Sequence, residues 1–538
     1  MKLTVNSIKN EHAGWEKAGF ILPKYDTEEA VRETQRSPEW IHFGAGNIFR
    51  GYIACLADEL IGKGMMKGGI IAADTFDTEP IERIYRPFDN LVLLVGLRAQ
   101  GERYLRVIGS IGRAEGASGE GLGYLKEAAR KPSLKMISFT ITEKGYAVTG
   151  IDGGVLPAAA ADIAAGPEGE LSTAAGKVSL LLYERFKAGG MPIALVSMDN
   201  CSRNGDKLRN AIEFTVKGWL DNGLVPEGFN EYVCGGGKVS FPWSMIDKIT
   251  PRPDPAVGKE LAELGIEGME PIVTARKTFI APYVNAEMPQ YLVIEDDFPN
   301  GRPPLEEAGV YLTDRETVDR AEKMKVMTCL NPLHTALAVF GCLLGYKKIS
   351  DEMNDTDLRE LVYRLGYDEG LPVVVDPGII RPEDFLREVL TERLPNPCLP
   401  DTPQRIATDT SQKLAIRFGE TVKAYAAKGE AGKLRLIPLV IAAWLRYLLA
   451  YDDEGESFER SPDPMLSELD KCVKPEWFTE PGSFTEDDRK AVTALLSNAS
   501  LFGTDLCAAG LSDSILTDFE AMLTGKGAVR QALKNALK

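Results

Sequence analysis

The chain has 538 residues, 44% of them hydrophobic and 26% charged, which is typical of a globular protein large enough for two or three domains. Its net charge of −17 would repel phosphate backbones and anionic lipid, so binding to nucleic acid or to a membrane surface is not expected. The chain has only three histidines, and its eight cysteines are scattered without a CxxC pair, which disfavours a metal site. The absence of an apolar signal segment indicates a cytoplasmic protein.

The first predicted element is a strand, tight turn and helix over residues 40–62. A short apolar run ends at Gly44 and Gly46, and apolar residues then return at helical spacing. Such glycines let the backbone approach a pyrophosphate, at which the free N–H groups of the new helix would point. A glycine-rich turn that binds nothing is the alternative. The predicted dinucleotide contacts are Gly44, Gly46, Asn47, Ile48, Phe49 and Arg50.

A second predicted strand, residues 69–74, ends in an acid. Asp74 lies about where a dinucleotide-binding fold places the carboxylate that binds the adenosine ribose. This carboxylate would repel a 2′-phosphate, so the sequence favours NAD over NADP as the cofactor. Asp77 is the alternative residue for this role.

Further strands are predicted at residues 90–95, 104–111, 135–142 and 193–197, with helical stretches between them. This alternation predicts a Rossmann-type, mostly parallel sheet. Ligands bind at the carboxyl ends of such strands. The polar segments that follow two of them, 142–144 and 199–200, are therefore expected to line the ligand site.

The pattern changes at the turn-rich segment 299–304, beyond which helical periodicity dominates. One of these helices is predicted to start at Thr485, with Asp488 as its capping partner. The apolar run 436–449 is too short to cross a bilayer and predicts a buried helix. We therefore expect an α/β fold with an NAD-binding Rossmann-type domain over residues 1–305 and an all-helical substrate and catalytic domain over 306–538.

A cluster of polar side chains is predicted around residues 324–334. Asn331 and Pro332 have the form of an N-cap followed by the first helical residue, so one helix should end near Leu330 and another begin. Lys325, Asn331 and His334 would then converge at this break. A surface lysine, a capping asparagine and a core histidine are the alternative interpretations.

Six segments, in this order, resemble the polyol-specific long-chain dehydrogenase family of mannitol dehydrogenases and hexuronate reductases. The resemblance covers most of the chain. In the variants HFGAGNIFRG and LNPLHTA it is strongest to the members that interconvert D-fructuronate and D-mannonate. The segments are WIHFGAGNIFRG (40–51), TITEKGY (140–146), SMDNCSRNG (197–205), FPWSMIDKITP (241–251), LNPLHTA (330–336) and RIATDTSQK (405–413).

The resemblance implies hydride transfer between NAD(P)(H) and a secondary alcohol or ketone, without a metal and with a lysine as general acid/base. Lys325 matches that lysine. Asn200 and Asn331 match the carboxamides that hydrogen-bond the developing alkoxide, and His334 matches the neighbouring histidine that orients the reacting group. Burial and nearby cations would have to lower the lysine pKa from about 10.4 toward neutrality.

The resemblance also implies substrate contacts, and the expected partner is a small-molecule sugar acid or polyol. Asp247 matches an active-site acid, and Arg405 and Lys413 match substrate-contacting positions. The two positive charges could hold a uronate carboxylate against the negative field of the protein. Ordinary surface cations are the alternative interpretation of Arg405 and Lys413.

The lysine spacing departs from the mannitol branch, in which the lysine lies five residues before the motif asparagine. Lys325 lies six residues before Asn331. One extra residue would swing the side chain by about 100° on a continuous helix. We expect the Asn331–Pro332 break to absorb this residue, with Lys323 and Lys144 as substitutes for the role.

Two other functions compete with fructuronate reduction. The chain could be another member of the family, a tagaturonate reductase or a mannitol 2-dehydrogenase. It could also be a non-catalytic dinucleotide or sugar-acid binding protein that has kept the fold.

Overall fold

The computed structural model describes residues 1–150, 152–480 and 482–538. They form two units. Unit 1 comprises residues 1–98 and 102–319, and unit 2 comprises residues 99–101 and 320–538. Unit 1 is an α/β unit and unit 2 is helical, which confirms the predicted fold class.

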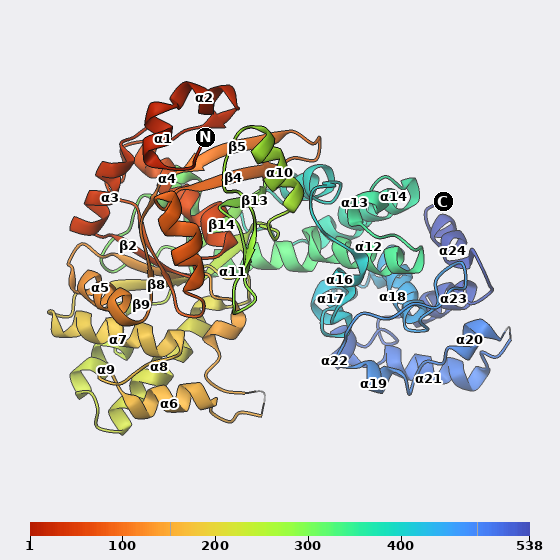
Figure 1. Ribbon diagram of the computed structural model, residues 1–538. Helices are drawn as coiled ribbons and strands as arrows, with labels where there is room; N and C mark the ends of the chain where they lie inside the picture. The colour runs from red at the N-terminus through yellow and green to blue at the C-terminus, as the bar shows by residue number, and fades with distance from the viewer. Residues whose placement is uncertain (151, 481) are drawn as a thin grey trace. The chain divides into compact units, whose positions relative to one another are not determined.

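Unit 1 is built around a six-stranded sheet with the order β6-β3-β2-β7-β8-β9. Figure 1 labels β2, β8 and β9 of this sheet. Every neighbouring pair is parallel, as predicted. The order runs outward in both directions from β2, the first of these strands in the chain, so the ligand-binding switch point of such a sheet lies at the carboxyl end of β2. The strands are β2 (Trp40–Phe43), β3 (Ile70–Asp74), β6 (Ile111–Gly116), β7 (Met136–Phe139), β8 (Ile193–Ser197) and β9 (Val239–Ser240).

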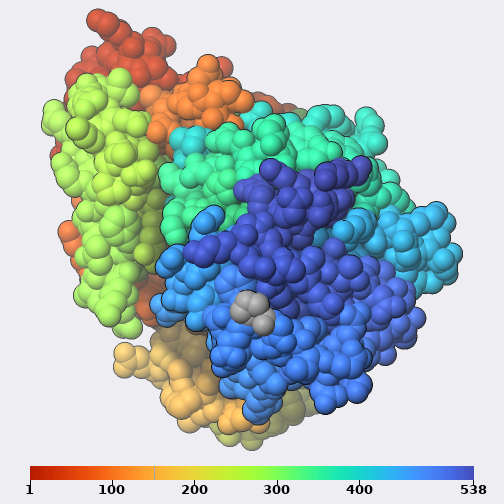
Figure 2. Space-filling model, turned by 90° about the vertical axis from the view of Figure 1, so that its right-hand side faces the viewer, coloured from red at the N-terminus to blue at the C-terminus, as the bar shows by residue number. Residues whose placement is uncertain are grey.

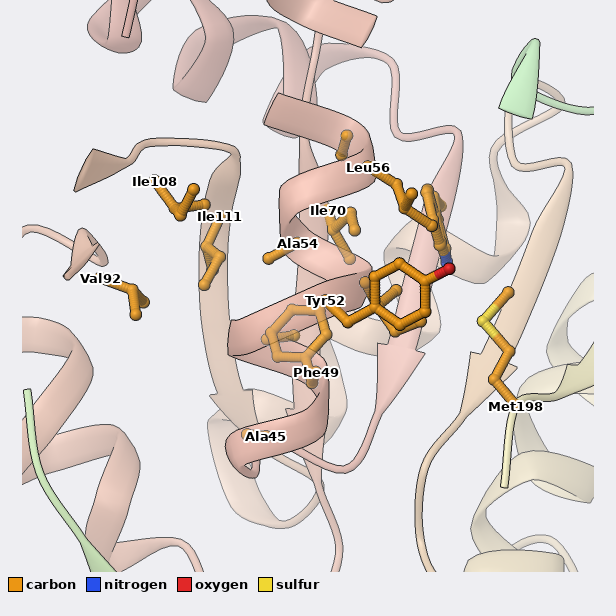
Figure 3. Packing of buried hydrophobic residues seen from close by; sticks show 14 of the residues in the cluster. Ala45, Phe49, Tyr52, Ala54, Leu56, Ile70, Val92, Ile108, Ile111 and Met198 are labelled. Atoms are coloured by element: carbon orange, nitrogen blue, oxygen red, sulfur yellow. The ribbon is translucent and has the colours of Figure 1, made fainter. Parts of the chain in front are cut away.

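Both faces of this sheet are covered, which is why its strands are almost continuously apolar. On one face, Ile41 and Phe43 pack with α5 (Gly119–Arg130), α7 (Ala174–Lys187) and α8 (Asn204–Asp221). On the other face, side chains of the helix that follows β2 pack with apolar residues of β3, β4 and the β5–β6 region. Figure 3 shows this second cluster, including Phe49, Tyr52, Ile70, Val92, Ile108 and Ile111.

Two of the predicted strands lie outside the parallel sheet. Residues 92–97 and 103–108 form the antiparallel hairpin β4–β5 in a separate sheet of order β1-β5-β4-β13, and β6 begins only at Ile111. The apolar pattern gives a strand but not its partner, and β4 pairs with β13 from far along the chain. The other strands are β1 (Phe20–Ile21), β4 (Val92–Leu97), β5 (Arg103–Ile108), β10 (Ser244–Asp247), β11 (Ile272–Val273), β12 (Phe279–Ile280), β13 (Tyr283–Glu287), β14 (Tyr291–Glu295) and β15 (Tyr311–Thr313).

Unit 2 is organised around α18 (Leu436–Tyr447), in which all 12 residues are buried. The buried helix predicted in this region is therefore confirmed. The Glu369 carboxylate accepts hydrogen bonds from the N–H groups of Leu436 (2.6 Å) and Ile437 (2.9 Å). These N–H groups have no intrahelical partner, so the Glu369 side chain caps the N-terminus of the helix. The C-terminal segment of the chain, dark blue in Figure 2, lies at the surface of unit 2.

The capping box predicted at Thr485 and Asp488 is present at the start of α21. The run Arg315–Leu343 is long and apolar enough to cross a membrane, but 78% of its most apolar window is buried, as in a core helix. Besides α18, the α-helices of this part of the chain are α11 (Arg315–Lys323), α12 (Asn331–Leu343), α13 (Ile349–Glu352), α14 (Thr356–Arg364), α15 (Pro382–Glu388), α16 (Pro403–Ala407), α17 (Glu420–Ala427), α19 (Leu466–Leu469), α20 (Glu476–Thr479), α21 (Glu486–Leu496), α22 (Ala499–Phe502), α23 (Ser512–Met522) and α24 (Ala528–Ala536), among the residues that the structure describes.

Candidate functional site

The glycine turn after β2 has one glycine that the backbone requires and one that leaves space. Gly44 has a φ of +106°, and a Cβ there would lie 2.2 Å from the Thr140 carbonyl oxygen. A Cβ on Gly46 would meet nothing within 4 Å. Gly44 therefore shapes the turn, whereas Gly46 keeps its outer side open to a ligand such as a pyrophosphate.

The helix after the turn starts as the π-helix η1 (Phe49–Ile53) and continues as α4 (Ala54–Gly62). Asn47 and Ile48 are partly exposed, but the side chains of Phe49 and Arg50 are fully buried. Arg50 donates to the Ala281 carbonyl (2.6 Å) and to Asn47 Oδ1 (2.8 Å). Of the predicted dinucleotide contacts, Phe49 and Arg50 therefore have side chains directed into the core, where Arg50 positions Asn47.

A hydrogen-bond chain below the turn was missed by sequence reasoning. His42 contacts the hydroxyls of Ser138 (2.6 Å, Nδ1) and Thr140 (2.8 Å, Nε2), and Thr140 Oγ1 donates to the Gly44 carbonyl (3.3 Å). The imidazole also stacks on Phe49, with 4.5 Å between ring centroids. Burial lowers the pKa of His42 to about 3, so this ring is neutral. The signal in the sequence is a histidine inside an otherwise apolar strand.

Asp74 ends β3 beside the glycine turn. Its carboxylate accepts hydrogen bonds from the N–H groups of Ala45 (3.1 Å), Phe76 (2.8 Å) and Asp77 (3.0 Å). Burial raises its pKa. A carboxylate has about four acceptor positions, so Asp74 can also accept a ribose hydroxyl. The buried cation of Lys177, which sequence reasoning missed, interacts electrostatically with Asp74.

Asp77, the alternative ribose ligand, has a structural partner. Its carboxylate is buried and accepts a hydrogen bond from Thr274 Oγ1 at 2.5 Å. Its other oxygen accepts from the Glu79 N–H at 3.2 Å. Asp77 therefore anchors the loop after β3, which leaves Asp74 as the better candidate for the ribose.

The two polar segments at the ends of β7 and β8 are held together by Asp199. The carboxylate accepts hydrogen bonds from the N–H groups of Ile141 and Thr142, both at 2.9 Å. Asn200 follows with its side chain exposed. Asn204 is fully buried and ties this loop to Ser244 in β10 (2.9 Å).

Asp247, a predicted substrate contact, is the last residue of β10 and is buried. Burial, together with the nearby charge of Asp247, raises the pKa of the Tyr52 phenol. Asp247 therefore lies within electrostatic reach of the helix that follows the glycine turn, in the same unit.

In unit 2, Lys325 is only 2% exposed and lies in the π-helix η6 (Met324–Cys329). The Leu330 N–H donates to the Lys325 carbonyl (3.1 Å), which is an i to i+5 bond. A π-turn holds one residue more than an α-turn. The π-turn between Lys325 and Leu330 can therefore absorb the extra residue that separates Lys325 from Asn331.

The predicted capping role of Asn331 is wrong. The residue that interrupts the helix is Leu330, and Asn331 is the first residue of α12. No side chain caps this helix, so the Asn331 carboxamide is not used for that purpose. Of the substitutes for Lys325, Lys323 is partly exposed and Lys144 is exposed.

Asp401, also missed by sequence reasoning, joins two of the predicted site residues. His334 Nε2 lies 3.4 Å from Asp401 Oδ2, without hydrogen-bond alignment, and Arg405 pairs with the other carboxylate oxygen. Burial alone would raise the pKa of Asp401, but His334 and Arg405 outweigh it and hold the pKa below its ordinary value. The Arg405 side chain is 60% exposed.

Lys413 completes the predicted set and lies at the end of the turn that follows α16. Its ammonium group donates to the Thr408 carbonyl. Burial and the nearby Arg417 lower its pKa. Within the residues that the structure describes, no group of three or more His, Cys, Asp or Glu side chains is arranged to hold a metal ion.

Comparison with known proteins gives matches along almost the whole chain. The family models of the mannitol dehydrogenase Rossmann domain and the mannitol dehydrogenase C-terminal domain match residues 38–307 and 317–523. D-mannonate oxidoreductase of Thermotoga maritima is 50% identical over 543 residues, covering 100% of this chain and 99% of that protein. Mannitol 2-dehydrogenase of Emericella nidulans is 29% identical over 498 residues, covering 91% and 90%.

Two solved structures are similar over most of their length. The Pseudomonas fluorescens mannitol 2-dehydrogenase ternary complex with NAD and D-mannitol has a TM-score of 0.69 and 25% identity, covering 100% of this chain and 99% of that one. A substrate-free D-sorbitol dehydrogenase has a TM-score of 0.79 and 24% identity, covering 96% and 97%.

Proposed function

Because the chain belongs to the mannitol dehydrogenase family, we propose that it is an NAD-dependent, metal-independent oxidoreductase that interconverts D-fructuronate and D-mannonate. Family membership makes it a polyol or sugar-acid dehydrogenase. The observation that carries the substrate is the 50% identity to a D-mannonate oxidoreductase over the full chain. The mannitol 2-dehydrogenase of Emericella nidulans is only 29% identical. A cytoplasmic location is part of the proposal.

The residues around the glycine turn fit a nicotinamide dinucleotide. Space is open beside Gly46, the first N–H groups of the following helix have no acceptor within that helix, and Asp74 can accept a ribose hydroxyl. The cofactor, when bound, would supply or accept the hydride. The negative charge of Asp74 favours NAD over its 2′-phosphorylated form.

In the proposed reaction, negative charge grows on the ketone oxygen of fructuronate as the carbonyl carbon is reduced. Lys325 would protonate this oxygen, and the carboxamides of Asn200 and Asn331 would donate hydrogen bonds to it. Two features support the lysine: it is buried, and it lies in a π-helix that can absorb the one-residue difference in spacing. His334, held near Asp401, would orient the reacting group.

The substrate is tested with a panel of D-fructuronate, tagaturonate and D-fructose, each with NADH and with NADPH. The expected result is the highest kcat/KM with fructuronate and NADH, followed as loss of NADH absorbance. Faster turnover of tagaturonate or fructose would overturn the substrate assignment. Tight NADH binding without turnover of any substrate would favour the binding-protein alternative.

The lysine is tested by Lys325→Ala, with Lys323→Ala, at the last residue of α11, as a matched control. Loss of a general acid/base should lower kcat/KM about 10²–10⁴-fold. NADH affinity should stay close to wild type. If Lys325→Ala stays within tenfold of wild type, or if Lys323→Ala shows the larger loss, Lys325 is not the proton donor.

A further inference from the structure

Arg417 is a half-buried arginine whose guanidinium has few partners. It lies in the π-helix η11 (Ala415–Gly419), and its Nη1 donates to the hydroxyl of Thr335. Its other side-chain N–H groups donate to no partner among the described residues. The guanidinium therefore keeps donors for a further ligand.

Two fully buried arginines of this chain have more partners than Arg417. Arg185 donates five hydrogen bonds to backbone carbonyls. Arg446 donates three and lies 3.8 Å from the ring centroid of Phe478. Burial lowers the pKa of Arg417 to about 10, and among the described residues no carboxylate lies close enough to raise it. A buried cation without an anion is costly, so this position suits a ligand that supplies one.

The surroundings of Arg417 are those of the candidate catalytic residues in unit 2. Its partner Thr335 directly follows His334 in α12. The helix that continues from η11 is bound to η6, which carries Lys325, because Thr421 Oγ1 donates to the Met327 carbonyl at 3.4 Å. The charge of Arg417 also acts on Lys413.

We propose that Arg417 binds the carboxylate of the sugar acid and so distinguishes it from a neutral ketose or polyol. The inference rests on the proposed function and names the residue that selects its substrate class. Arg405 is already paired with Asp401, and Lys413 already donates to the Thr408 carbonyl. The planar fork of Arg417 matches a carboxylate in two parallel hydrogen bonds, which a lysine cannot reproduce.

The test compares D-fructuronate with D-fructose, which has a hydroxymethyl group in place of the carboxylate. Arg417→Gln should lower kcat/KM for fructuronate roughly 100-fold, because two charge-assisted hydrogen bonds are lost, and should leave fructose turnover within threefold. Arg417→Lys should lose about tenfold on fructuronate alone. Lys423→Gln, which removes a positive charge from an exposed ion pair with Glu420, should match wild type.

The outcomes separate this inference from the proposed function. A wild-type enzyme whose kcat/KM for fructose equals that for fructuronate overturns both the proposed function and the role of Arg417. A wild type that prefers fructuronate, with Arg417→Gln keeping that preference, overturns the role of Arg417 alone. Equal losses on both substrates would mean that Arg417 only positions Thr335 and His334, and a loss confined to NADH affinity would mean that it binds the cofactor. If Arg417→Gln does not fold, the selective loss in Arg417→Lys decides.

Discussion

At the scale of single residues, the two glycines of the turn after β2 have different physical reasons to be glycine. At Gly44 both the positive φ and the Thr140 carbonyl exclude a side chain. At Gly46 the protein itself would tolerate one, because the space beside it is open. A glycine at this position is therefore explained by the space that a bound molecule needs.

Gly44→Ala should therefore destabilise the unliganded protein, by about 1–3 kcal/mol or more, because the backbone is strained and the turn must shift. Gly46→Ala should change unliganded stability by about 0.5 kcal/mol at most, but should weaken NADH binding. Thermal unfolding and a fluorescence titration with NADH measure the two effects. Equal losses of stability in both variants would contradict the distinction.

Sequence reasoning could place Gly44 and Gly46 in the turn and Asp74 at the end of β3, because the local backbone dictates these positions. It could not foresee that the Arg50 side chain is buried, since an arginine in a glycine-rich motif suggests an anion ligand. Its burial depends on the Ala281 carbonyl, 231 residues further along the chain. Such a contact leaves no local pattern.

At the scale of elements, η6 explains the unusual lysine spacing. Its i to i+5 bond takes up one residue more than an α-helical turn does, just before the helix is interrupted at Leu330. Periodicity analysis assumes about 3.6 residues per turn and cannot detect this. It placed the adjustment at Asn331–Pro332, one element too late.

Deletion of Val326 should convert η6 to a regular α-helical turn and leave Lys325 five residues before Asn331. We expect kcat/KM within about tenfold of wild type, because the lysine keeps its face. Deletion of Val339 in the middle of α12 is the control, and should unfold the protein because it rotates a buried helix. If the Val326 deletion folds but loses activity as fully as Lys325→Ala, the π-helix does not set the position of the lysine.

The end of α13 contains a carboxyl group without a partner. Glu352 is fully buried, and neither of its oxygens has a hydrogen-bond partner among the described residues. Burial, with Asp355 and Asp351 nearby, raises its pKa well above the ordinary value. The folded protein therefore keeps a proton on Glu352 at pH values at which the unfolded chain releases it.

A raised carboxyl pKa means that stability is present below the unfolded pKa of about 4.3 and is lost as pH rises. The free energy of unfolding should fall by up to about 1.4 kcal/mol per pH unit from this one group. Glu352→Gln should remove that loss, so the variant matches wild type near pH 4 and exceeds it at pH 8. Denaturant unfolding at both pH values measures this, with Glu360→Gln, at an exposed carboxylate of α14, as the control. A constant difference between Glu352→Gln and wild type at both pH values would contradict the shift.

At the scale of the whole molecule, the chain consists of two units, and unit 1 alone contains the glycine turn and Asp74. The class of each unit could be predicted, because alternating strands and helices differ visibly from continuous helical periodicity. The division of the strands among separate sheets could not. β4 pairs with β13, and that pairing is decided by packing rather than by local pattern.

Calorimetry should show the location of the dinucleotide site. NADH at 100 times its Kd should stabilise the transition of unit 1 by about 2.7 kcal/mol. The transition of unit 2 should move less. Gly44→Ala identifies the unit 1 transition, because it should lower that one selectively. A shift confined to the unfolding transition of unit 2 would contradict a cofactor site at the glycine turn of unit 1.

The imidazole below the glycine turn makes the protein respond to acid in two ways. An unfolded chain would take up a proton at His42 near pH 6.5, whereas the folded chain resists until about pH 3. Mild acid therefore lowers the free energy of unfolding, because the unfolded state, in which the ring is hydrated, binds the proton. Between these two pH values His42 of the folded protein stays uncharged. The affinity of the glycine turn for a phosphate should therefore not change through His42, whereas the free energy of unfolding falls.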